Sequence, residues 1–256
     1  MSAMSDVALR FTGVAKHYGR LEVLSEVSFE VAAGELFGLV GLNGAGKTTL
    51  LKCLLDFCDF DHGAIEIFGV GHNAPAARSR LAFLPERFNP PYFLTGGDFI
   101  RYVLEMHATD YSSDDVARAM AAFDLDIAAL ERPVRAYSKG MTQKLGLAAC
   151  FLSRKPLYVL DEPTSGLDPK ARALLKAQMR SSHALGSAVF FTSHVLADIA
   201  ELCDRMAVVH GGRMRFVGTP EELCLQQSAP DLEQAFLNCI AAPLDAWPTE
   251  GLTSTL

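Results

Sequence analysis

A glycine-rich stretch at residues 38–51, GLVGLNGAGKTTLL, holds the residue types in this chain best suited to binding phosphate groups. It fits the phosphate-loop pattern G-x-x-x-x-G-K-[ST] at four positions, Gly41, Gly46, Lys47 and Thr48. Glycines let consecutive backbone N–H groups turn toward phosphate oxygens, and a helix after the loop points its N-terminal amides at the same anion. The alternative is a glycine-rich turn with an incidental lysine. Because an apolar strand pattern precedes the loop and a helical pattern follows it, we predict a nucleotide-binding site.

Two side chains of this loop have distinct expected roles. Lys47 places a mobile positive charge near the terminal phosphates, and the Thr48 hydroxyl is a hard oxygen ligand that suits Mg²⁺. We expect nucleotide contacts from every residue of the loop, namely Gly41, Leu42, Asn43, Gly44, Ala45, Gly46, Lys47, Thr48 and Thr49.

A second constellation lies at residues 157–162, LYVLDE, an apolar strand pattern that ends in two acids. The carboxyl ends of strands are where α/β sheets place ligand chemistry. We predict that Asp161 holds the metal ion, directly or through water. Glu162 comes next along a predicted strand at 157–161, so we expect its side chain on the other face, where it orients or deprotonates the attacking water. Alone, these acids would favour a simple strand cap; beside a phosphate loop they favour catalysis.

Two further side chains are candidates. His194 follows a predicted strand at 187–192 and reaches the edge that carries Asp161 if the two strands are neighbours; we assign it to sensing the γ-phosphate, because a neutral imidazole both donates and accepts. Tyr18 precedes Gly19 in a strand-turn setting. Its ring either stacks on adenine or packs on a small β-subdomain, and both interpretations stay open.

The pattern of elements predicts an α/β fold with a parallel, three-layer core. Strand patterns occur at 7–16, 21–31, 35–40, 63–68, 81–84, 157–161, 187–192, 205–210 and 213–218. Helical patterns occur at 47–57, 95–108, 112–123, 126–131, 138–153, 169–182, 195–202, 219–227 and 231–241. The helices between about 95 and 150 interrupt the alternation, so we predict a helical subdomain inserted between core strands.

Bulk properties exclude several classes of protein. Half of the residues are hydrophobic, which allows a sizeable core, and the formal charge of −7 argues against nucleic-acid binding. Six cysteines, at 53, 58, 150, 203, 224 and 239, show no C-x-x-C spacing, so we expect buried, reduced thiols. We expect no signal peptide at the start MSAMSDVALR and no membrane-spanning helix, since no apolar run approaches about 20 residues.

Taken together, these motifs resemble the ATP-binding subunit of ABC transporters. The resemblance runs from about residue 7 to 237 and rests on ordered segments: Tyr18 as the adenine-stacking aromatic, GLNGAGKTT at 41–49 as Walker A, YSKGMTQ at 137–143 as the signature loop, LYVLDE at 157–162 as Walker B, SGLD at 165–168 as the D-loop, and His194 as the switch histidine. A lone phosphate loop would not be specific, but the ordered set is.

The resemblance implies a P-loop NTPase (ABC ATPase) that binds ATP and Mg²⁺. It also implies a homodimer or a heterodimer of paralogous subunits, in which each ATP is held between one subunit's Walker A and the other's signature loop. Ser138 and the Gly140 amide would then contact the γ-phosphate across the interface, and Asp168 would lie at the seam. A separate membrane permease would be the partner, placing the chain in the cytoplasm, peripheral to the membrane.

The resemblance also implies a division of the chain. We expect one ABC ATPase domain at 1–242, with a β-subdomain and core at 7–86 and 155–242, an antiparallel β-subdomain within it, and a helical subdomain at about 87–154. A flexible tail would follow at 243–256.

This sequence departs from the family pattern at two motifs. Glu86 stands where the family has its Q-loop glutamine; as a third candidate metal ligand it either binds Mg²⁺ more tightly than an amide or repels the γ-phosphate. The signature loop has Lys139 and Met141 in place of Gly and Gln. With the ending LEQAFL, these variants resemble exporter-type subunits of drug, antibiotic and polysaccharide efflux systems.

There are three alternatives to a transport ATPase. The first is a soluble ABC-type ATPase without a transport partner, in DNA repair, translation or cofactor assembly. DNA-repair members carry long coiled-coil inserts and translation members usually carry tandem cassettes, and neither feature fits in 256 residues. A non-hydrolysing regulatory subunit conflicts with the intact Lys47, Asp161, Glu162 and His194. A phosphate-loop kinase or GTPase leaves the signature loop unexplained. The apolar loop RFNPPYFL at 87–94 is either buried in the helical subdomain or a docking surface for the permease.

Overall fold

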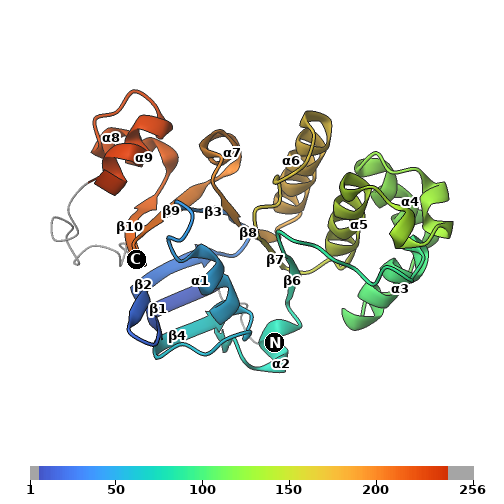
Figure 1. The fold of residues 1–256 in the computed structure, drawn as a ribbon, viewed down its shortest axis with the longest axis horizontal. Helices are drawn as coiled ribbons and strands as arrows, with labels where there is room; N and C mark the ends of the chain where they lie inside the picture. Colours follow the sequence, from blue (N-terminus) through green and yellow to red (C-terminus); the bar gives the residue numbers. More distant parts are fainter. Residues whose placement is uncertain (1–5, 242–256) are drawn as a thin grey trace.

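The computed structural model describes residues 6–241, and its centre is a six-stranded sheet (Figure 1). The strand order is β10-β9-β3-β8-β7-β6, and neighbouring strands are parallel except for the antiparallel pair β9 and β10. Every residue of β3, β7 and β8 is buried, which explains their continuous apolar sequences. The bounds are β3 Leu36–Val40, β6 Leu81–Leu84, β7 Leu157–Leu160, β8 Ala188–Ser193, β9 Arg205–His210 and β10 Arg213–Gly218.

A second, antiparallel sheet packs beside the first with the order β2-β1-β4-β5. Its strands are β1 Val7–Tyr18, β2 Leu21–Ala32, β4 His62–Ile67 and β5 Val70–Gly71. The phosphate-loop helix α1 (Lys47–Leu54) lies against this sheet in Figure 1, and the short helix α2 (Pro75–Arg78) follows β5. One apolar cluster joins both sheets and α1, with Phe11 stacked on Phe29 at 4.5 Å between ring centroids and Phe190 of β8 beside them. The phosphate loop is thereby fixed between two sheets.

A second apolar cluster includes residues of the six-stranded sheet and of the helices that follow β7. These helices are α6 Pro169–Ala184, α7 Leu196–Leu202, α8 Pro220–Gln226 and α9 Leu232–Ala241. Thr219 and Glu222 form a capping box that starts α8, with each side chain bonded to the other residue's backbone N–H.

The chain between β6 and β7 forms a group of helices at one end of the molecule, apart from α1 and the antiparallel sheet (Figure 1). They have an apolar cluster of their own, which includes Phe99, Met120 and Leu145. Ser112 caps α4 by accepting a hydrogen bond from the Asp115 N–H, as its sequence position predicts. The elements are α3 Gly96–Met106, α4 Ser113–Ala122, α5 Lys139–Leu152 and two 3₁₀ helices, Ile127–Glu131 and Val134–Ala136.

The predicted α/β fold class and the order of the predicted elements are confirmed. Several details differ. The strand predicted at 157–161 ends at Leu160, and the helix predicted at 126–131 is a 3₁₀ helix. The short elements α2, β5 and the 3₁₀ helix Val134–Ala136 were missed. The subdomain boundaries stay a prediction, and the tail predicted at 243–256 lies outside the described residues. Among residues 6–241, no helix has the length and apolar character needed to cross a bilayer.

Candidate functional site

The phosphate-loop pattern lies where β3 ends and α1 begins, and its glycines are required by geometry. Gly44 and Gly46 have φ angles of 81° and 110°, which side-chain-bearing residues rarely adopt. At Gly41, a Cβ atom would lie 2.5 Å from the backbone oxygen of Val209. The loop can therefore wind closely around a ligand only with glycine at these three positions.

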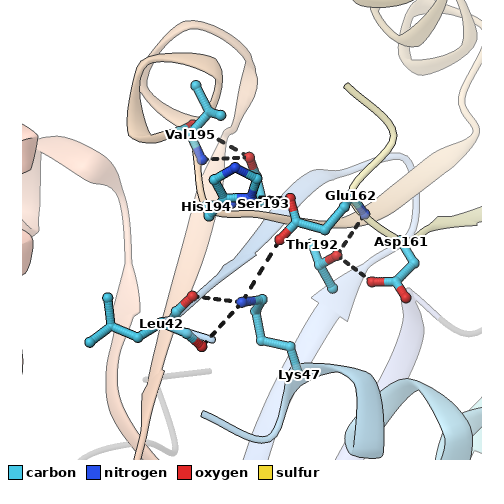
Figure 2. Close-up of polar contacts among 9 residues, drawn as sticks. Leu42, Lys47, Asp161, Glu162, Thr192, Ser193, His194 and Val195 are labelled. Atoms are coloured by element: carbon cyan, nitrogen blue, oxygen red, sulfur yellow. Dashed lines mark hydrogen bonds and ion pairs between the residues drawn. The ribbon is translucent and has the colours of Figure 1, made fainter. Parts of the chain in front are cut away.

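Lys47 is the first residue of α1, and its side chain turns back along the loop (Figure 2). Its ammonium donates to the backbone oxygens of Gly41 at 2.6 Å and Leu42 at 3.4 Å, and Nζ lies 3.8 Å from Glu162 Oε1. Burial lowers the pKa of Lys47, against the opposing effect of the carboxylates around it. An anion near Nζ would favour the charged form, so the site is suited electrostatically to phosphate.

Asp161 and Glu162 follow β7, and a threonine of the neighbouring strand β8 holds both of them (Figure 2). The Thr192 hydroxyl accepts the Glu162 N–H at 2.8 Å and donates to Asp161 Oδ1 at 2.7 Å. Glu162 has a φ of 46°, a left-handed conformation that is unusual for glutamate. Because β7 ends at Leu160, the strand alternation from which the opposite face was predicted for Glu162 does not extend to this pair, and both acids line one cavity.

His194 follows β8 at the same edge of the sheet, and β7 and β8 are neighbours as the prediction required. Its Nδ1 lies 2.7 Å from Glu162 Oε2, and its backbone N–H donates to the same oxygen at 3.3 Å. The histidine side chain is 59% exposed whereas that of Glu162 is 10% exposed, so the imidazole forms the outer wall of the site. Glu162 is thereby contacted from one side by Lys47 and from the other by His194.

These side chains line one cavity of about 330 Å³. Among the predicted residues, the cavity brings together Leu42, Asn43, Gly44, Ala45, Gly46, Lys47, Thr48, Thr49, Glu86, Asp161, Glu162 and His194. Gly41 does not line the cavity, but its carbonyl oxygen accepts a hydrogen bond from the Lys47 ammonium. The sequence analysis missed Val23 of β2, which also lines the cavity, and Thr192, which positions both acids from β8.

Besides Gly41, four predicted residues do not line this cavity. Tyr18 ends β1 half-exposed, and its hydroxyl donates to Cys58 Sγ at 3.7 Å. Ser138 and Asp168 cap α5 and α6, accepting the N–H groups of Met141 and Ala171 respectively. Gly140 lies in the first turn of α5, where a Cβ atom would meet only Ser138 Oγ, at 4.0 Å.

Oxygen donors suited to a divalent cation lie together in this cavity. Thr48 supplies a hydroxyl, and Asp161 and Glu86 supply carboxylates that line the same cavity. Burial raises the pKa of Asp161, so a cation would relieve a desolvated charge. No group of three His, Cys, Asp or Glu side chains within residues 6–241 forms a metal site by itself. Mg²⁺ is usually bound by one or two carboxylates with substrate phosphates completing its shell, so these residues fit Mg²⁺ bound together with a nucleotide.

A strand that runs into a glycine loop and a helix, with two acids and a histidine at the same sheet edge, defines a phosphate-loop nucleotide-binding protein. Comparison with known proteins narrows this class. The family described as ABC transporter matches residues 24–165.

Two relatives and one solved structure each share about a third of their residues with this chain over most of its length. The Nod factor export ATP-binding protein I of Sinorhizobium fredii is 36% identical over 243 residues, covering 91% of this chain and 68% of that protein. The protein of the same name from Burkholderia orbicola is 36% identical over 240 residues, covering 91% and 78%. A solved structure of an ATP-binding subunit of an ABC transporter has a TM-score of 0.81 at 30% identity and covers 91% of this chain and 99% of its own.

The chain therefore belongs to the ABC transporter family, as one of its ATP-binding ATPases. The predicted resemblance to this family is confirmed.

Proposed function

We propose that this chain hydrolyses ATP to power export through a separate membrane permease. Export is supported by the two relatives named as Nod factor export proteins and by the sequence variants around Glu86 and Ser138. The main support for ATP hydrolysis is the position of Glu162 in the cavity. Its Oε1 lies 3.8 Å from Lys47 Nζ, and its Oε2 lies 2.7 Å from His194 Nδ1.

We assign nucleotide binding to the loop and the start of α1. The amides of residues 42–49 surround the phosphates, and Lys47 exchanges its contacts with Gly41 and Leu42 for phosphate oxygens. Thr48 and Asp161 would hold Mg²⁺, with Glu86 as a further ligand at the rim of the cavity. The bound ion would neutralise phosphate charge during transfer.

We assign the hydrolytic step to Glu162. Its carboxylate accepts a hydrogen bond from the attacking water and takes up a proton as the water attacks the γ-phosphorus. Thr192 fixes its backbone, His194 fixes Oε2 and Lys47 lies 3.8 Å from Oε1, so the carboxylate is positioned before substrate arrives. The imidazole, exposed on its outer side, donates to the γ-phosphate.

Two chains are proposed to complete each site. Ser138, Gly140 and Asp168 lie at the starts of α5 and α6, outside the cavity that their own chain forms. Helix N-termini bind anions well, so a second copy or a paralogue facing this one would present α5 to the γ-phosphate.

The permease is proposed to dock beside the 87–94 loop. Tyr92 and Phe93 are each 68% exposed, whereas Phe88 and Leu94 are half-buried, so the loop is partly core and partly surface. Next to it lies a mainly apolar cavity of about 410 Å³ whose wall includes Phe57, 68% exposed, and Phe83. An apolar exposed patch of this kind marks an interaction site. Docking there would place the chain on the cytoplasmic face of the membrane.

Glu162→Gln tests the proposed hydrolysis. The variant should bind ATP with wild-type affinity, lose at least about 100-fold of ATPase turnover and accumulate an ATP-bound dimer on size exclusion. Glu105→Gln, an exposed glutamate on α3, is the matched control and should keep wild-type turnover. Wild-type turnover in Glu162→Gln would remove Glu162 from this role.

The dimer and the permease need tests of their own. Ser138→Arg should keep ATP binding by the monomer and abolish hydrolysis, and normal hydrolysis would refute the shared site. For the transport role, Tyr92→Asp with Phe93→Asp should abolish co-purification with a co-expressed multi-span permease from the neighbouring reading frame. Unchanged ATPase activity of the isolated double variant would show that only docking was lost.

A further inference from the structure

Two cysteines lie side by side at the end of the phosphate-loop helix. Cys53 is fully buried in α1 and Cys58 is half-buried just beyond it, and their sulfur atoms are 3.7 Å apart. The expectation of buried thiols is right for Cys53, Cys150 and Cys239, whereas Cys58, Cys203 and Cys224 are half-buried.

The chain reversal after α1 creates this pair. The Asp56 N–H donates to the Cys53 carbonyl and the Phe57 N–H donates to the Lys52 carbonyl, while Asp56 has a φ of 61°. This is the Schellman arrangement, in which a left-handed residue turns the chain back over the last helical turn. The residue that follows, Cys58, is thereby returned to the side of Cys53. The proximity is fixed by backbone hydrogen bonds and does not depend on side-chain rotation alone.

The environment of the pair assigns a different part to each thiol. Cys58 is accessible to small oxidants, whereas Cys53 is 0% exposed. Burial and then the adjoining Cys58 thiol raise the pKa of Cys53 to about 12, with Lys16 opposing the shift. Cys53 is therefore protected from direct attack by oxidants. The Tyr18 hydroxyl donates to Cys58 Sγ, so the same sulfur contacts the residue proposed to stack on adenine.

We propose that Cys53 and Cys58 are a modification site, forming a reversible disulfide when a hydroperoxide oxidises Cys58, and that this bond weakens nucleotide binding through Tyr18. The Cys58 thiolate attacks one peroxide oxygen, the O–O bond breaks, and an alcohol or water leaves as Cys58 becomes a sulfenic acid. The Cys53 sulfur then displaces hydroxide from Cys58, and its thiol proton leaves with it as water. Two thiols are oxidised, the peroxide is reduced, and a thiol reductant reverses the bond.

The effect on nucleotide binding rests on the proposed function of Tyr18. A disulfide has its sulfurs about 2.05 Å apart, so Cys58 Sγ must move toward Cys53 from the present 3.7 Å. That movement displaces the sulfur that accepts the Tyr18 hydroxyl hydrogen bond. Loss of one weak hydrogen bond that positions the ring should weaken nucleotide binding by about three- to tenfold.

The first experiment detects the bond itself. The full chain is treated with hydrogen peroxide at a few equivalents, alkylated and digested with trypsin. Cleavage after Lys52 and Arg78 releases one peptide, residues 53–78, that contains both cysteines and no other. We expect this peptide to lose two hydrogens and to resist alkylation until dithiothreitol is added. Cys224→Ser, which changes a half-buried cysteine outside the pair, should behave as wild type, and Cys58→Ser should leave residue 53 unoxidised.

Full alkylation of both cysteines after peroxide, or irreversible oxidation of Cys58 without the cross-link, would overturn the proposed site.

The second experiment titrates a fluorescent ATP analogue into oxidised and reduced protein. Oxidised wild type should bind three- to tenfold more weakly, with no such change in Cys58→Ser. Equal affinity despite a formed disulfide would overturn the effect on binding. Failure of the reduced protein to bind nucleotide would refute the proposed function, while the peptide mass would still report on the disulfide.

Discussion

Thr192 is the side chain on which the geometry of the site depends most, and Thr192→Val tests this. Thr192 is 0% exposed, and its hydroxyl accepts from the Glu162 N–H and donates to Asp161. Valine has nearly the same shape but no hydroxyl, so the substitution removes both hydrogen bonds without opening a large cavity.

The expected loss of stability follows from what remains unpaired. A buried N–H without a partner costs about 1–3 kcal/mol, and a hydrogen bond to a carboxylate contributes about 1.5–3 kcal/mol. Because the two losses share one atom, they do not add fully, and we expect the free energy of unfolding to fall by about 3 kcal/mol. At about 2–4 °C per kcal/mol for a chain of this size, Tm should fall by about 6–12 °C.

Activity should fall as well, because the same hydrogen bond holds Glu162 at its left-handed φ of 46°. Without it the carboxylate is no longer fixed, and we expect at least a tenfold loss of ATPase turnover at unchanged ATP affinity. Urea unfolding and an ATPase assay measure the two effects.

Two control variants make the test specific. Thr192→Ser keeps the hydroxyl and should retain most of the activity, while Thr12→Val changes an exposed strand threonine and should alter unfolding by less than about 0.5 kcal/mol. If the free energy of unfolding of Thr192→Val lies within about 0.5 kcal/mol of the wild-type value and the variant hydrolyses ATP at the full rate, the positioning role of Thr192 is wrong.

Three further predictions concern individual groups. Gly46→Ala should lower stability by at least about 1–3 kcal/mol and abolish nucleotide binding in a titration, because φ is 110° and the new Cβ meets a Leu24 methyl carbon at 2.9 Å. Lys176→Met should cost about 3–5 kcal/mol in urea unfolding, because it strips the 2.6 Å partner from the buried Asp198 carboxylate. Burial raises the pKa of Asp161 above its unfolded value near 3.8, so wild-type stability should fall as pH rises through that shifted pKa; Asp161→Asn should remove this loss and raise Tm at pH 7 while abolishing ATPase activity.

The phosphate loop was predictable because most of its determinants are local. Gly44 and Gly46 are required by their positive φ angles, and Lys47 follows Gly46 directly at the helix start. Only the requirement for Gly41 comes from a distant segment, the backbone oxygen of Val209. Family motifs located Asp161, Glu162 and His194, and the strands that carry them are neighbours in the sheet.

Other features depend on contacts between distant segments. Thr192 serves the two acids only because Leu160 pairs with Phe191, which places the next residues of β7 and β8 side by side. No local pattern marks this register. The left-handed conformation of Glu162, just after the end of β7, has no glycine to signal it. The Cys53–Cys58 contact likewise depends on a Schellman turn whose left-handed residue is Asp56 rather than glycine.

The charge of the cavity favours a divalent cation at the site. The cavity holds three carboxylates, those of Glu86, Asp161 and Glu162, and one ammonium, that of Lys47. Burial also lowers the pKa of Lys47, which weakens its hold on the proton that carries the positive charge. A nucleotide triphosphate brings more negative charge into the same space, and the loop amides supply only partial positive charges. Coulombic repulsion among these groups is large where side chains are shielded from water. We therefore infer that Mg²⁺ is needed first for binding, since it offsets the carboxylates that hydrolysis requires, and that the substitution of Glu86 for the usual glutamine increases this dependence.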